Sequence, residues 1–351
     1  MKGSIERVRA VLHGQMPDRA PLYDLLRNDA VVSHFAGETL TVENAAQVVF
    51  RAFEPAVDAT RPLVRLPEHE RTEVLPDGRK RRFFRWTIWD EHVAYADSAA
   101  YAAAKRAQLD AYDPSWTAER QASLERSLES ITNHRRRLGE VFFFPGGPGV
   151  GVQGVYGEIG FDHFCYYMAD YPDLIDELIE MSTVQTVNWL EHLPPNHGIE
   201  AVMIGDDVAF KTAPMLSPKW FREHYFGRLA RVTAAYHRQG IKVLFHSDGN
   251  LNLVLGGLVE AGIDGLNPIE VLAGMDVGDI HRCHPHLFMC GGIDVSQLLP
   301  LGTPEQVSEA VHRAIDAAEG RIMIGSSTEL NNEVPLANYL ALREAVLNHP
   351  Y

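Results

Sequence analysis

From residue 141 to the C-terminus, short apolar runs alternate with longer amphipathic segments, and this alternation limits the possible folds more than any other feature of the sequence. The apolar runs predict strands at residues 141–147, 201–207, 241–246, 265–267, 287–294 and 321–328. The other segments predict helices at residues 161–168, 172–193, 217–238, 251–261, 303–318 and 335–347. Strand–helix units repeated at this spacing indicate a parallel sheet with right-handed crossovers.

The N-terminal part of the chain fits the same scheme, apart from one insert. Its predicted helices cover residues 1–14, 42–53, 99–111 and 118–138, and its predicted strands cover residues 20–26 and 57–60. Residues 66–93 instead have the pattern of a β-hairpin that turns at Pro76-Asp77-Gly78. The chain holds about seven to eight strand–helix units, so we expect one α/β domain, a (β/α)₈ TIM barrel over residues 1–351, with a small N-terminal hairpin insert.

Polar residues stand at the predicted carboxyl ends of several different strands. They are Asp206 and Asp207, His246 and Asp248, Glu270, Asp294, and residues 326–329. A barrel builds its active site at this face, whereas an open sheet gathers its ligand groups at one switch point. No GxGxxG dinucleotide fingerprint opens a helix after the first predicted strand, the sequence has no P-loop, and the glycine-rich residues 146–149 include no lysine. The pattern therefore favours an active site at a barrel mouth.

Charge and cysteine content limit the partners and the compartment. The formal net charge of −15 is unfavourable for binding nucleic acid or an anionic membrane. No apolar stretch approaches the ~20 residues that span a bilayer, and no signal-peptide run follows the first residues. Three cysteines without a CxxC pair argue against a disulfide framework. We expect a cytoplasmic protein in a reducing compartment.

His246 and Asp248 are the central candidates for metal binding. They lie two residues apart at a strand end, so in an extended chain both side chains point to the same side. An imidazole and a carboxylate placed in this way can bind a divalent metal, transfer a proton or hydrogen-bond each other. Asp248 can also cap the next helix, which is the structural alternative. Glu329 is a further candidate ligand, whereas Cys290 is expected to pack in a strand, although a free thiol can also bind metal.

Three carboxylates are candidates for acid–base catalysis. Asp206 and Asp207 are adjacent, so in an extended chain they face opposite sides and only one points into the barrel mouth. A second carboxylate nearby raises the pKa of such a group and makes it a proton donor to a leaving phenolate or amine. Lys211 can instead neutralise the pair structurally. Glu270 follows the next strand and can act as a general acid or a third metal ligand.

Four other residues near the predicted mouth are candidates for substrate binding. Tyr156 and Phe161 flank the glycine-rich loop and can contact a flat substrate, and Arg27 and Asn267 can supply polar contacts. The histidine-rich segment at residues 281–286 precedes a strand, so we assign it to the opposite, structural face of the barrel.

Several stretches together resemble the uroporphyrinogen decarboxylase-like superfamily. They are GIKVLFHSDGN, AGIDGLNPIEVLAGMDV, FMCGGID, TPEQV and GSSTELNNEVPLANYLALREAV. The members of that superfamily are (β/α)₈ barrels, so the resemblance implies the same fold here. It contains the haem-pathway decarboxylase and the cobalamin-linked methyltransferases that act on methanol, methylamines, methyl halides or aryl methyl ethers.

Two motifs resemble the methyltransferase branch more than the decarboxylase. The decarboxylase has a stretch similar to PVWxMRQAGR, whereas this chain has PLYDLLRNDA, with Arg27 displaced by one position and Asp24 nearby. Such acidic surroundings would bind a polycarboxylate poorly. The methyltransferases bind zinc through an HxC motif and a second cysteine after the last strand. This chain has His246-Ser247-Asp248 and then Ser326 or Ser327, so any zinc would have harder oxygen ligands.

We therefore expect a metal-assisted methyltransferase that moves a methyl group from a small methylated substrate, of the aryl methyl ether or methylamine type, to a corrinoid protein. Zinc is the expected metal, and the corrinoid is expected on a separate partner because the chain has no DxHxxG motif. The alternative is cofactor-free decarboxylation of uroporphyrinogen III, with Asp207 or Asp24 stabilising the protonated pyrrole. A barrel that only binds a tetrapyrrole and hands it on is a third alternative. The resemblance is also compatible with a homodimer.

Overall fold

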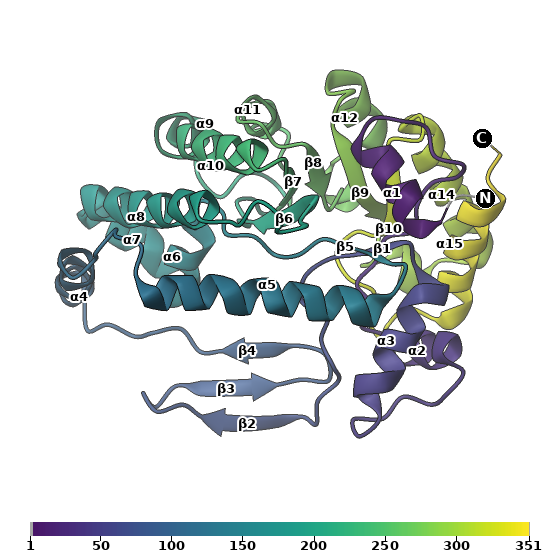
Figure 1. Cartoon of the computed structure of the whole chain (residues 1–351), viewed down its shortest axis with the longest axis horizontal. Coiled ribbons are helices and arrows are strands. Elements are labelled where there is room, and N and C mark those ends of the chain that lie inside the picture. The colour runs from purple at the N-terminus through teal and green to yellow at the C-terminus, as the bar shows by residue number, and fades with distance from the viewer. Residues whose placement is uncertain (1–2, 351) are drawn as a thin grey trace.

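A curved parallel sheet forms the centre of the molecule in the computed structural model, which describes residues 3–350 (Figure 1). Five strands run in the order β10–β9–β8–β7–β6, and every neighbouring pair is parallel. Their bounds are β6 (Ala201–Gly205), β7 (Lys242–His246), β8 (Gly265–Asn267), β9 (Phe288–Ile293) and β10 (Ile322–Ser326). Most of their residues are buried, as expected for strands covered on both faces.

Short extended segments from the N-terminal half close this sheet into a ring. They are residues 22–26, β1 (Ala59–Thr60) and β5 (Phe142–Phe143). On one side, the Tyr23 amide donates a hydrogen bond to the Ile324 carbonyl of β10 at 2.7 Å. On the other side, the Met203 amide of β6 donates to the Pro145 carbonyl at 2.9 Å. The ring therefore contains eight extended segments, which confirms the predicted (β/α)₈ barrel.

The strand predicted at residues 20–26 is an extended segment that makes single bridges rather than a regular ladder. Pro21 has no amide hydrogen to donate. The Leu25 amide donates to the Asp24 carboxylate at 2.9 Å instead of to a neighbouring strand. These two residues explain why the pairing on either side of this segment is brief.

Large side chains fill the barrel, and helix α1 (Ser4–Leu12) covers its amino-terminal end. One buried cluster joins the ring to this helix, and its members are Val8, Val11, Leu12, Tyr23, Ala59, Phe142, Phe144, Ala201, Met203, Leu244, Phe288, Cys290 and Met323. Arg9 of α1 pairs with Glu200, just before β6, at 2.7 Å, which places α1 at the start of the strands. Cys290 is fully buried here, and burial raises the pKa of its thiol well above the usual value. This environment favours a packing role for Cys290.

Helices cover the outside of the ring (Figure 1). They are α2 (Asp29–Ala36), α3 (Ala45–Ala56), α4 (Ser98–Asp110), α5 (Ala118–Leu138), α6 (Val152–Ile159), α7 (Phe161–Asp170), α8 (Pro172–Glu191), α9 (Pro218–Trp220), η1 (Phe221–Tyr225), α10 (Phe226–Arg238), α11 (Leu255–Glu260), η2 (Val271–Ala273), α12 (Val277–Cys283), α13 (Leu298–Leu301), α14 (Pro304–Ala317) and α15 (Leu336–Asn348). Local signals set several ends: the Thr117 side chain caps α5, and Thr303 with Gln306 forms a capping box at α14.

Some helices differ from the sequence predictions for local reasons. The prediction missed α6, which contains Gly154 and Gly157 and so has a low intrinsic helix propensity. It also missed α2, although the Asn28 side chain accepts a hydrogen bond from the Val31 amide as an N-cap. The helix predicted at residues 217–238 is interrupted by the π-helical turn η1.

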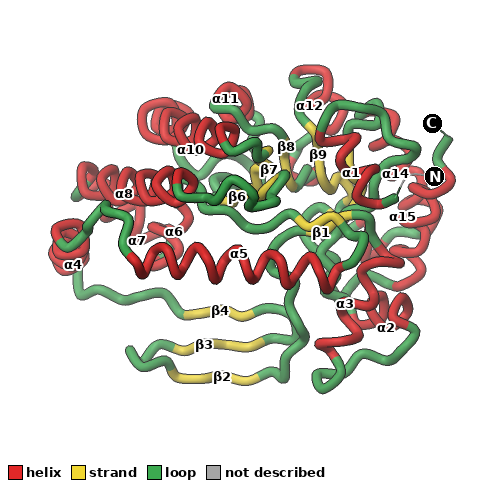
Figure 2. Tube along the Cα trace, viewed as in Figure 1, coloured by secondary structure: helices red, strands yellow, loops and turns green. Residues whose placement is uncertain are grey.

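The insert is a three-stranded antiparallel sheet, which is drawn below α5 in the view of Figure 2. Its strands are β2 (Arg71–Val74), β3 (Lys80–Phe83) and β4 (Ile88–Asp90). Gly78 has φ of 87° and makes the turn between β2 and β3, a conformation that glycine adopts without strain. On β3, Arg81 pairs with Asp90 of β4 at 2.7 Å, so this part of the basic run lies on a solvated strand face.

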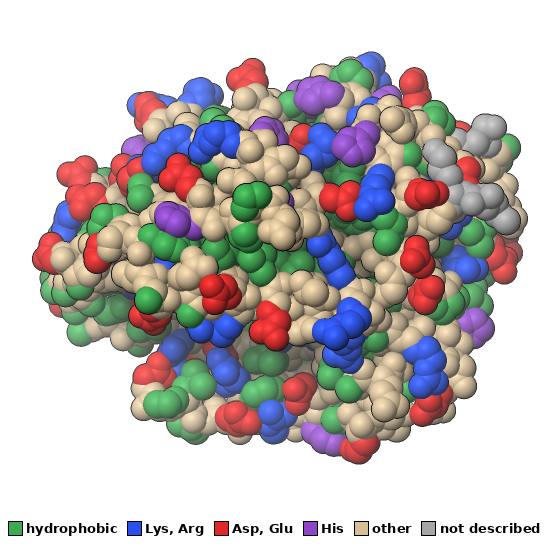
Figure 3. All heavy atoms as spheres, in the orientation of Figure 1, with side chains coloured by type: hydrophobic (Ala, Val, Ile, Leu, Met, Phe, Trp, Pro, Cys, Tyr) green, Lys and Arg blue, Asp and Glu red, His purple; other side chains and the backbone are tan. Residues whose placement is uncertain are grey.

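The surface shows mixed charge. Acidic and basic side chains are interspersed on the face drawn in Figure 3. Within residues 3–350, no helix is both long and apolar enough to cross a membrane.

Candidate active site

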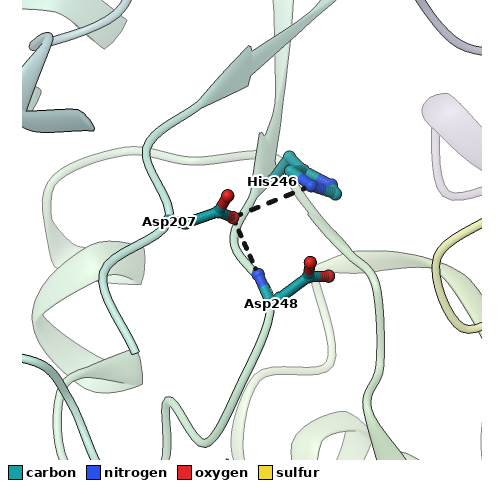
Figure 4. Close-up of side chains that lie close together, drawn as sticks. All are labelled: Asp207, His246 and Asp248. Carbon is teal, nitrogen blue, oxygen red and sulfur yellow. Dashed lines mark hydrogen bonds and ion pairs between the residues drawn. The ribbon is translucent and has the colours of Figure 1, made fainter. Parts of the chain in front are cut away.

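Three side chains from two neighbouring strand ends come together at the barrel mouth (Figure 4). Asp207 follows β6, His246 ends β7, and Asp248 comes two residues later. One ligand atom of each residue lies within 4.8 Å of the other two. Parallel strands end at the same edge of the ring, which is why residues so distant in sequence meet here.

A glutamine and a backbone amide orient Asp207. Its Oδ2 accepts a hydrogen bond from Nε2 of Gln153 at 2.6 Å, and its own amide donates to Oε1 of Gln153 at 3.2 Å. Its Oδ1 accepts from the Asp248 amide at 3.1 Å and lies 3.8 Å from Nε2 of His246. Gln153 was not predicted as a site residue, because it lies on helix α6, which the sequence pattern did not indicate.

The His246 ring is held so that Nε2 faces the site. Nδ2 of Asn267 donates to the Cys290 carbonyl at 3.2 Å, so Oδ1 of the same amide faces Nδ1 of His246 at 2.7 Å. This hydrogen-bond pattern places the proton on Nδ1 and leaves a lone pair on Nε2. Burial, followed by the charge of Arg61, lowers the pKa of His246. The imidazole is therefore neutral near pH 7 and able to bind a metal.

Asp248 contributes a carboxylate oxygen that the protein leaves without a donor. Its Oδ1 is buried and accepts no hydrogen bond from the described residues. Burial, with additional effects of Asp207 and Glu270, raises the pKa of Asp248 to about 7. A buried carboxylate without a partner is costly. The local arrangement therefore suits a bound cation or a proton.

Asp206 points away from this cluster. Its carboxylate accepts hydrogen bonds from the Gly151 amide at 3.0 Å, the Gln153 amide at 2.8 Å and the Tyr225 hydroxyl at 3.1 Å. Burial raises the pKa of Asp206 to about 6. Asp206 thus anchors the start of helix α6, and Asp207 is the aspartate in the cluster, as expected if only one of the two points into the barrel mouth. The catalytic roles of both residues stay predictions.

Asn267 is the last residue of β8, and Glu270 follows that strand. Oε2 of Glu270 accepts from the Gly249 amide at 2.6 Å, which fixes the turn after Asp248. Asn267 was predicted to bind substrate, but its side chain is fully buried and both ends of its amide are engaged. Its contacts make it a positioning residue for His246.

Glu329 lies against two arginines rather than in the three-residue cluster. Its Oε1 is 2.7 Å from Nη1 of Arg27, and its Oε2 is 3.3 Å from Nη2 of Arg61. Both arginines are 5% exposed. Glu329 is therefore not one of the three clustered residues, where the third member is Asp207, and its predicted role as a metal ligand stays a prediction. Arg61 was missed by the sequence analysis, although it directly follows β1 and so has the same strand-end position as the predicted residues.

Aromatic side chains border the cluster on the α6 side. The Tyr156 hydroxyl donates to the Asp207 carbonyl at 2.7 Å. The rings of Tyr156 and Phe161 are edge to face at 5.8 Å, and Phe161 meets Phe210 in the same way at 5.4 Å. Their positions agree with the predicted contact of Tyr156 and Phe161 with a flat substrate, which stays a prediction.

A large cavity of about 1110 Å³ lies elsewhere, between α12, α13 and α14. Val277, Leu298, Leu301 and Arg313 are among its lining residues. None of the three clustered residues lines it. The candidate active site is therefore identified by its converging polar side chains and not by the volume of this cavity.

Comparison with known proteins supports the fold and the family. Residues 99–349 match the family described as uroporphyrinogen decarboxylase (URO-D). None of the curated proteins compared with the chain matches it. A solved methyltransferase from Methanosarcina mazei superposes with a TM-score of 0.69 at 17% identity, covering 98% of both chains. A B12-independent methionine synthase from Shewanella sp. W3-18-1, in complex with selenomethionine, gives a TM-score of 0.48 at 10% identity, covering 94% of this chain and 98% of that one.

The Methanosarcina likeness shows that this chain has the same fold as a methyltransferase. The family match covers more than half of the sequence and includes β6 to β10, whose ends carry Asp207, His246 and Asp248. The chain therefore belongs to the uroporphyrinogen decarboxylase (URO-D) family.

Proposed function

We propose that this protein is a metal-assisted methyltransferase. It takes a methyl group from a small methylated substrate, of the aryl methyl ether or methylamine type, and passes it to a corrinoid carried by a separate protein. The observation that carries this proposal is the convergence of Asp207, His246 and Asp248 at the barrel mouth. The methyltransferase fold of the Methanosarcina protein supports it at the level of architecture.

The residues present fit a divalent metal such as zinc. They offer one imidazole nitrogen and two carboxylates, and Oδ1 of Asp248 is buried without any other partner among the described residues. Two ligands of tetrahedral zinc lie roughly 3.4 Å apart, given metal–ligand distances of ~2.1 Å. Nε2 of His246 and Oδ1 of Asp207 are 3.8 Å apart, which a small adjustment would bring to that value. Three protein ligands leave a fourth position open, as in catalytic zinc sites.

The metal, when bound, supplies Lewis-acid polarisation of the heteroatom that carries the methyl group. The chain's own residues orient the metal ligands and supply a proton to the leaving group. Gln153 and Asn267 hold Asp207 and His246 in place. Glu270 lies beside Asp248 and is our candidate for the proton donor to the leaving oxygen or nitrogen.

Metal content is the first test. Elemental mass spectrometry of protein purified without chelators should find near-stoichiometric zinc in the wild type and little in His246→Ala or Asp248→Ala. His281→Ala is a matched control, because His281 lies outside the cluster and pairs with Glu319. A wild type free of metal, or zinc retained in both cluster variants, would reject the site.

The activity test uses a reduced corrinoid protein as methyl acceptor and a panel of methyl ethers and methylamines. Demethylation that requires His246 supports the proposal, and no turnover of any compound would contradict it.

Cofactor-free decarboxylation of uroporphyrinogen III is the second candidate. The family match and the two buried arginines beside Glu329 favour it, because arginines bind carboxylates well. Turnover of uroporphyrinogen III by metal-free protein, unchanged in His246→Ala, would select this alternative.

A further inference from the structure

The cavity between α12, α13 and α14 lies where the connection from β8 to β9 contains little helix. Helix α12 has only seven residues, and the segment before it contains only the three-residue turn η2. The cavity, of about 1110 Å³, is lined by residues of α14 between Gln306 and Ala317, and on its inner side by Gly292 of β9. None of the three clustered residues lines it, so it is separate from the candidate active site.

Much of the lining is apolar. Met275 and Val277 are buried at the start of α12, and Leu298 of α13 is half-buried. Leu272 and Leu301 also line the cavity, although 44% and 75% of their surfaces are exposed. An apolar ligand would cover these two leucines and remove their surface from water, which the hydrophobic effect favours.

The polar part of the lining favours a cation. Four carboxylates and one guanidinium line the cavity, and they belong to Asp276, Asp294, Glu309, Asp316 and Arg313. The guanidinium of Arg313 already lies 3.7 Å from Glu309. Oδ1 of Asp276 accepts from the Asp279 amide at 2.8 Å, whereas its Oδ2 has no donor among the described residues. The excess of negative charge attracts an ammonium group and repels a carboxylate.

A short segment connects this cavity to the candidate active site. Glu270 is the N-cap residue of η2, and its Oε2 accepts from the Gly249 amide at 2.6 Å, directly after Asp248. Val271 and Leu272, the next two residues, line the cavity. The same seven-residue stretch therefore contacts the active-site turn at one end and the cavity at the other.

Two more hydrogen bonds join the segment to the residues after Asp248. The Leu251 amide donates to Sδ of Met275 at 3.3 Å, and Nδ2 of Asn252 donates to the Gly274 carbonyl at 2.9 Å. A shift of residues 270–275 would therefore move the turn that carries Asp248.

We propose that this cavity is a second ligand site, for an apolar organic cation, and that its occupancy controls the active site through residues 270–275. A ligand packed on Leu272 and Met275 stabilises the present position of η2, and with it the hydrogen bond between Glu270 and Gly249. The link to catalysis rests on the proposed function, in which Glu270 is the proton donor. The ligand site itself does not depend on that function.

Three naphthalene compounds of nearly equal size test the ligand class. They are 2-naphthylmethylamine, which is a cation at pH 7, the neutral 2-naphthylmethanol and the anion 2-naphthoate. By calorimetry we expect the amine to bind about 3-fold more tightly than the alcohol and about 10-fold more tightly than the carboxylate. Ala310→Trp fills the cavity from α14 and should abolish binding. Ala103→Trp is a matched control, because Ala103 is exposed on α4, and it should bind normally.

A gain-of-binding variant guards against misfolding as an explanation. Leu301 is the most exposed of the lining leucines, so Leu301→Glu should raise the affinity for the amine about 3-fold and Leu301→Lys should lower it by a similar factor. No binding of the amine up to its solubility limit, or equal binding of amine and carboxylate, overturns the proposal. So does binding that persists in Ala310→Trp or is lost in Tyr156→Ala, because the probe would then lie outside this cavity.

Hydrogen exchange tests the coupling without metal or activity. A saturating concentration of the amine should slow exchange of the amides in residues 247–252 by about 5-fold or more, in the wild type but not in Ala310→Trp. Slower exchange confined to α12, α13 and α14 would reject control of the active site.

The failure of this inference is distinguishable from that of the proposed function. Amine binding and slower exchange at residues 247–252, in a protein that demethylates no compound, leave the ligand site standing and reject methyl transfer. Demethylation of a methyl ether at a kcat/KM that the saturating amine does not change keeps methyl transfer and rejects the control.

Discussion

Oδ1 of Asn267 lies 2.7 Å from Nδ1 of His246 and accepts a hydrogen bond from it, so the opposite ring nitrogen is the one that faces the site. Asn267 is fully buried and its Nδ2 donates to the Cys290 carbonyl, so neither group of the amide is free to exchange roles. An imidazole whose second nitrogen is held in this way is a typical metal ligand.

Asn267→Leu should therefore weaken zinc binding about 10- to 100-fold, since the ring loses its fixed orientation and tautomer. A competition titration with a zinc chelator measures this directly. Asn267→Asp keeps an acceptor at the same place and should lose much less. Zinc affinity unchanged in Asn267→Leu would show that the ring orientation does not depend on this amide.

Zinc should also stabilise the folded protein, because the three candidate ligands come together only in the native barrel. At a free zinc concentration of 100 times Kd, the free energy of unfolding should rise by about 2.7 kcal/mol. Calorimetric melting with and without a chelator tests this. Asp248→Asn should show a much smaller shift, and an equal shift in this variant would place the metal elsewhere.

Asp206 should contribute to stability rather than to chemistry. Asp206→Ala leaves two backbone amides and the Tyr225 hydroxyl without an acceptor, so we expect a loss of about 3 kcal/mol in the free energy of unfolding. Tyr225→Phe removes only one of these bonds and should cost about 1 kcal/mol. Urea denaturation gives both values, and a fully stable Asp206→Ala protein would refute the anchoring role.

Gly325 should tolerate no side chain. A Cβ at this position of β10 would collide with the Tyr23 carbonyl, where residues 22–26 join the ring. We expect Gly325→Ala to lower the free energy of unfolding by about 3 kcal/mol or more, roughly the cost of severe overpacking. Gly227→Ala is the control. Gly227 lies in helix α10, and a Cβ added there would meet nothing within 4 Å outside its own helix backbone, so this variant should be neutral or stabilising.

Asp24 should make stability fall as the pH rises. Burial raises its pKa to about 6, while Ser326 and Leu25 donate hydrogen bonds that partly oppose this effect. The folded state binds this proton more tightly than the unfolded chain does. The contribution of Asp24 to the free energy of unfolding is therefore fully present at low pH and is lost as the pH rises through about 6. Asp24→Asn should reduce the change in unfolding free energy between pH 4 and pH 7 by about 3 kcal/mol at most. An identical pH profile in the variant would contradict the shifted pKa.

Strand-end residues could be predicted from the sequence because a buried apolar run ends abruptly where polar residues begin. His246 and Asp248 follow such a run in IKVLF, and Asp207 follows AVMIG. The barrel itself was predictable for the same reason, since the alternation of strands and helices is regular after residue 141.

The hydrogen-bond and ion-pair partners of a side chain could not be predicted in this way, because they depend on how the loops and turns place distant segments. Glu329 has the right position in the sequence, but its neighbours across the ring are arginines. Gln153 lies on a glycine-containing helix with little intrinsic propensity. Asn267 is a residue type that often contacts substrates. Only the structure shows that its side-chain amide also donates to the carbonyl of Cys290 and so has no free hydrogen-bonding group for a substrate.

The way in which the ring closes gives the two halves of the mouth different folding requirements. The half with Asp207, His246 and Asp248 comes from strands that follow one another in sequence, so it can form through contacts of short sequence separation. The half with Arg27, Arg61 and Glu329 requires residues 22–26 to meet β10, about 300 positions later. During synthesis, the arginine side must therefore wait for the last strand to leave the ribosome. Until then the first strands lack the neighbour that completes their pairing, and their open edges are exposed to other chains.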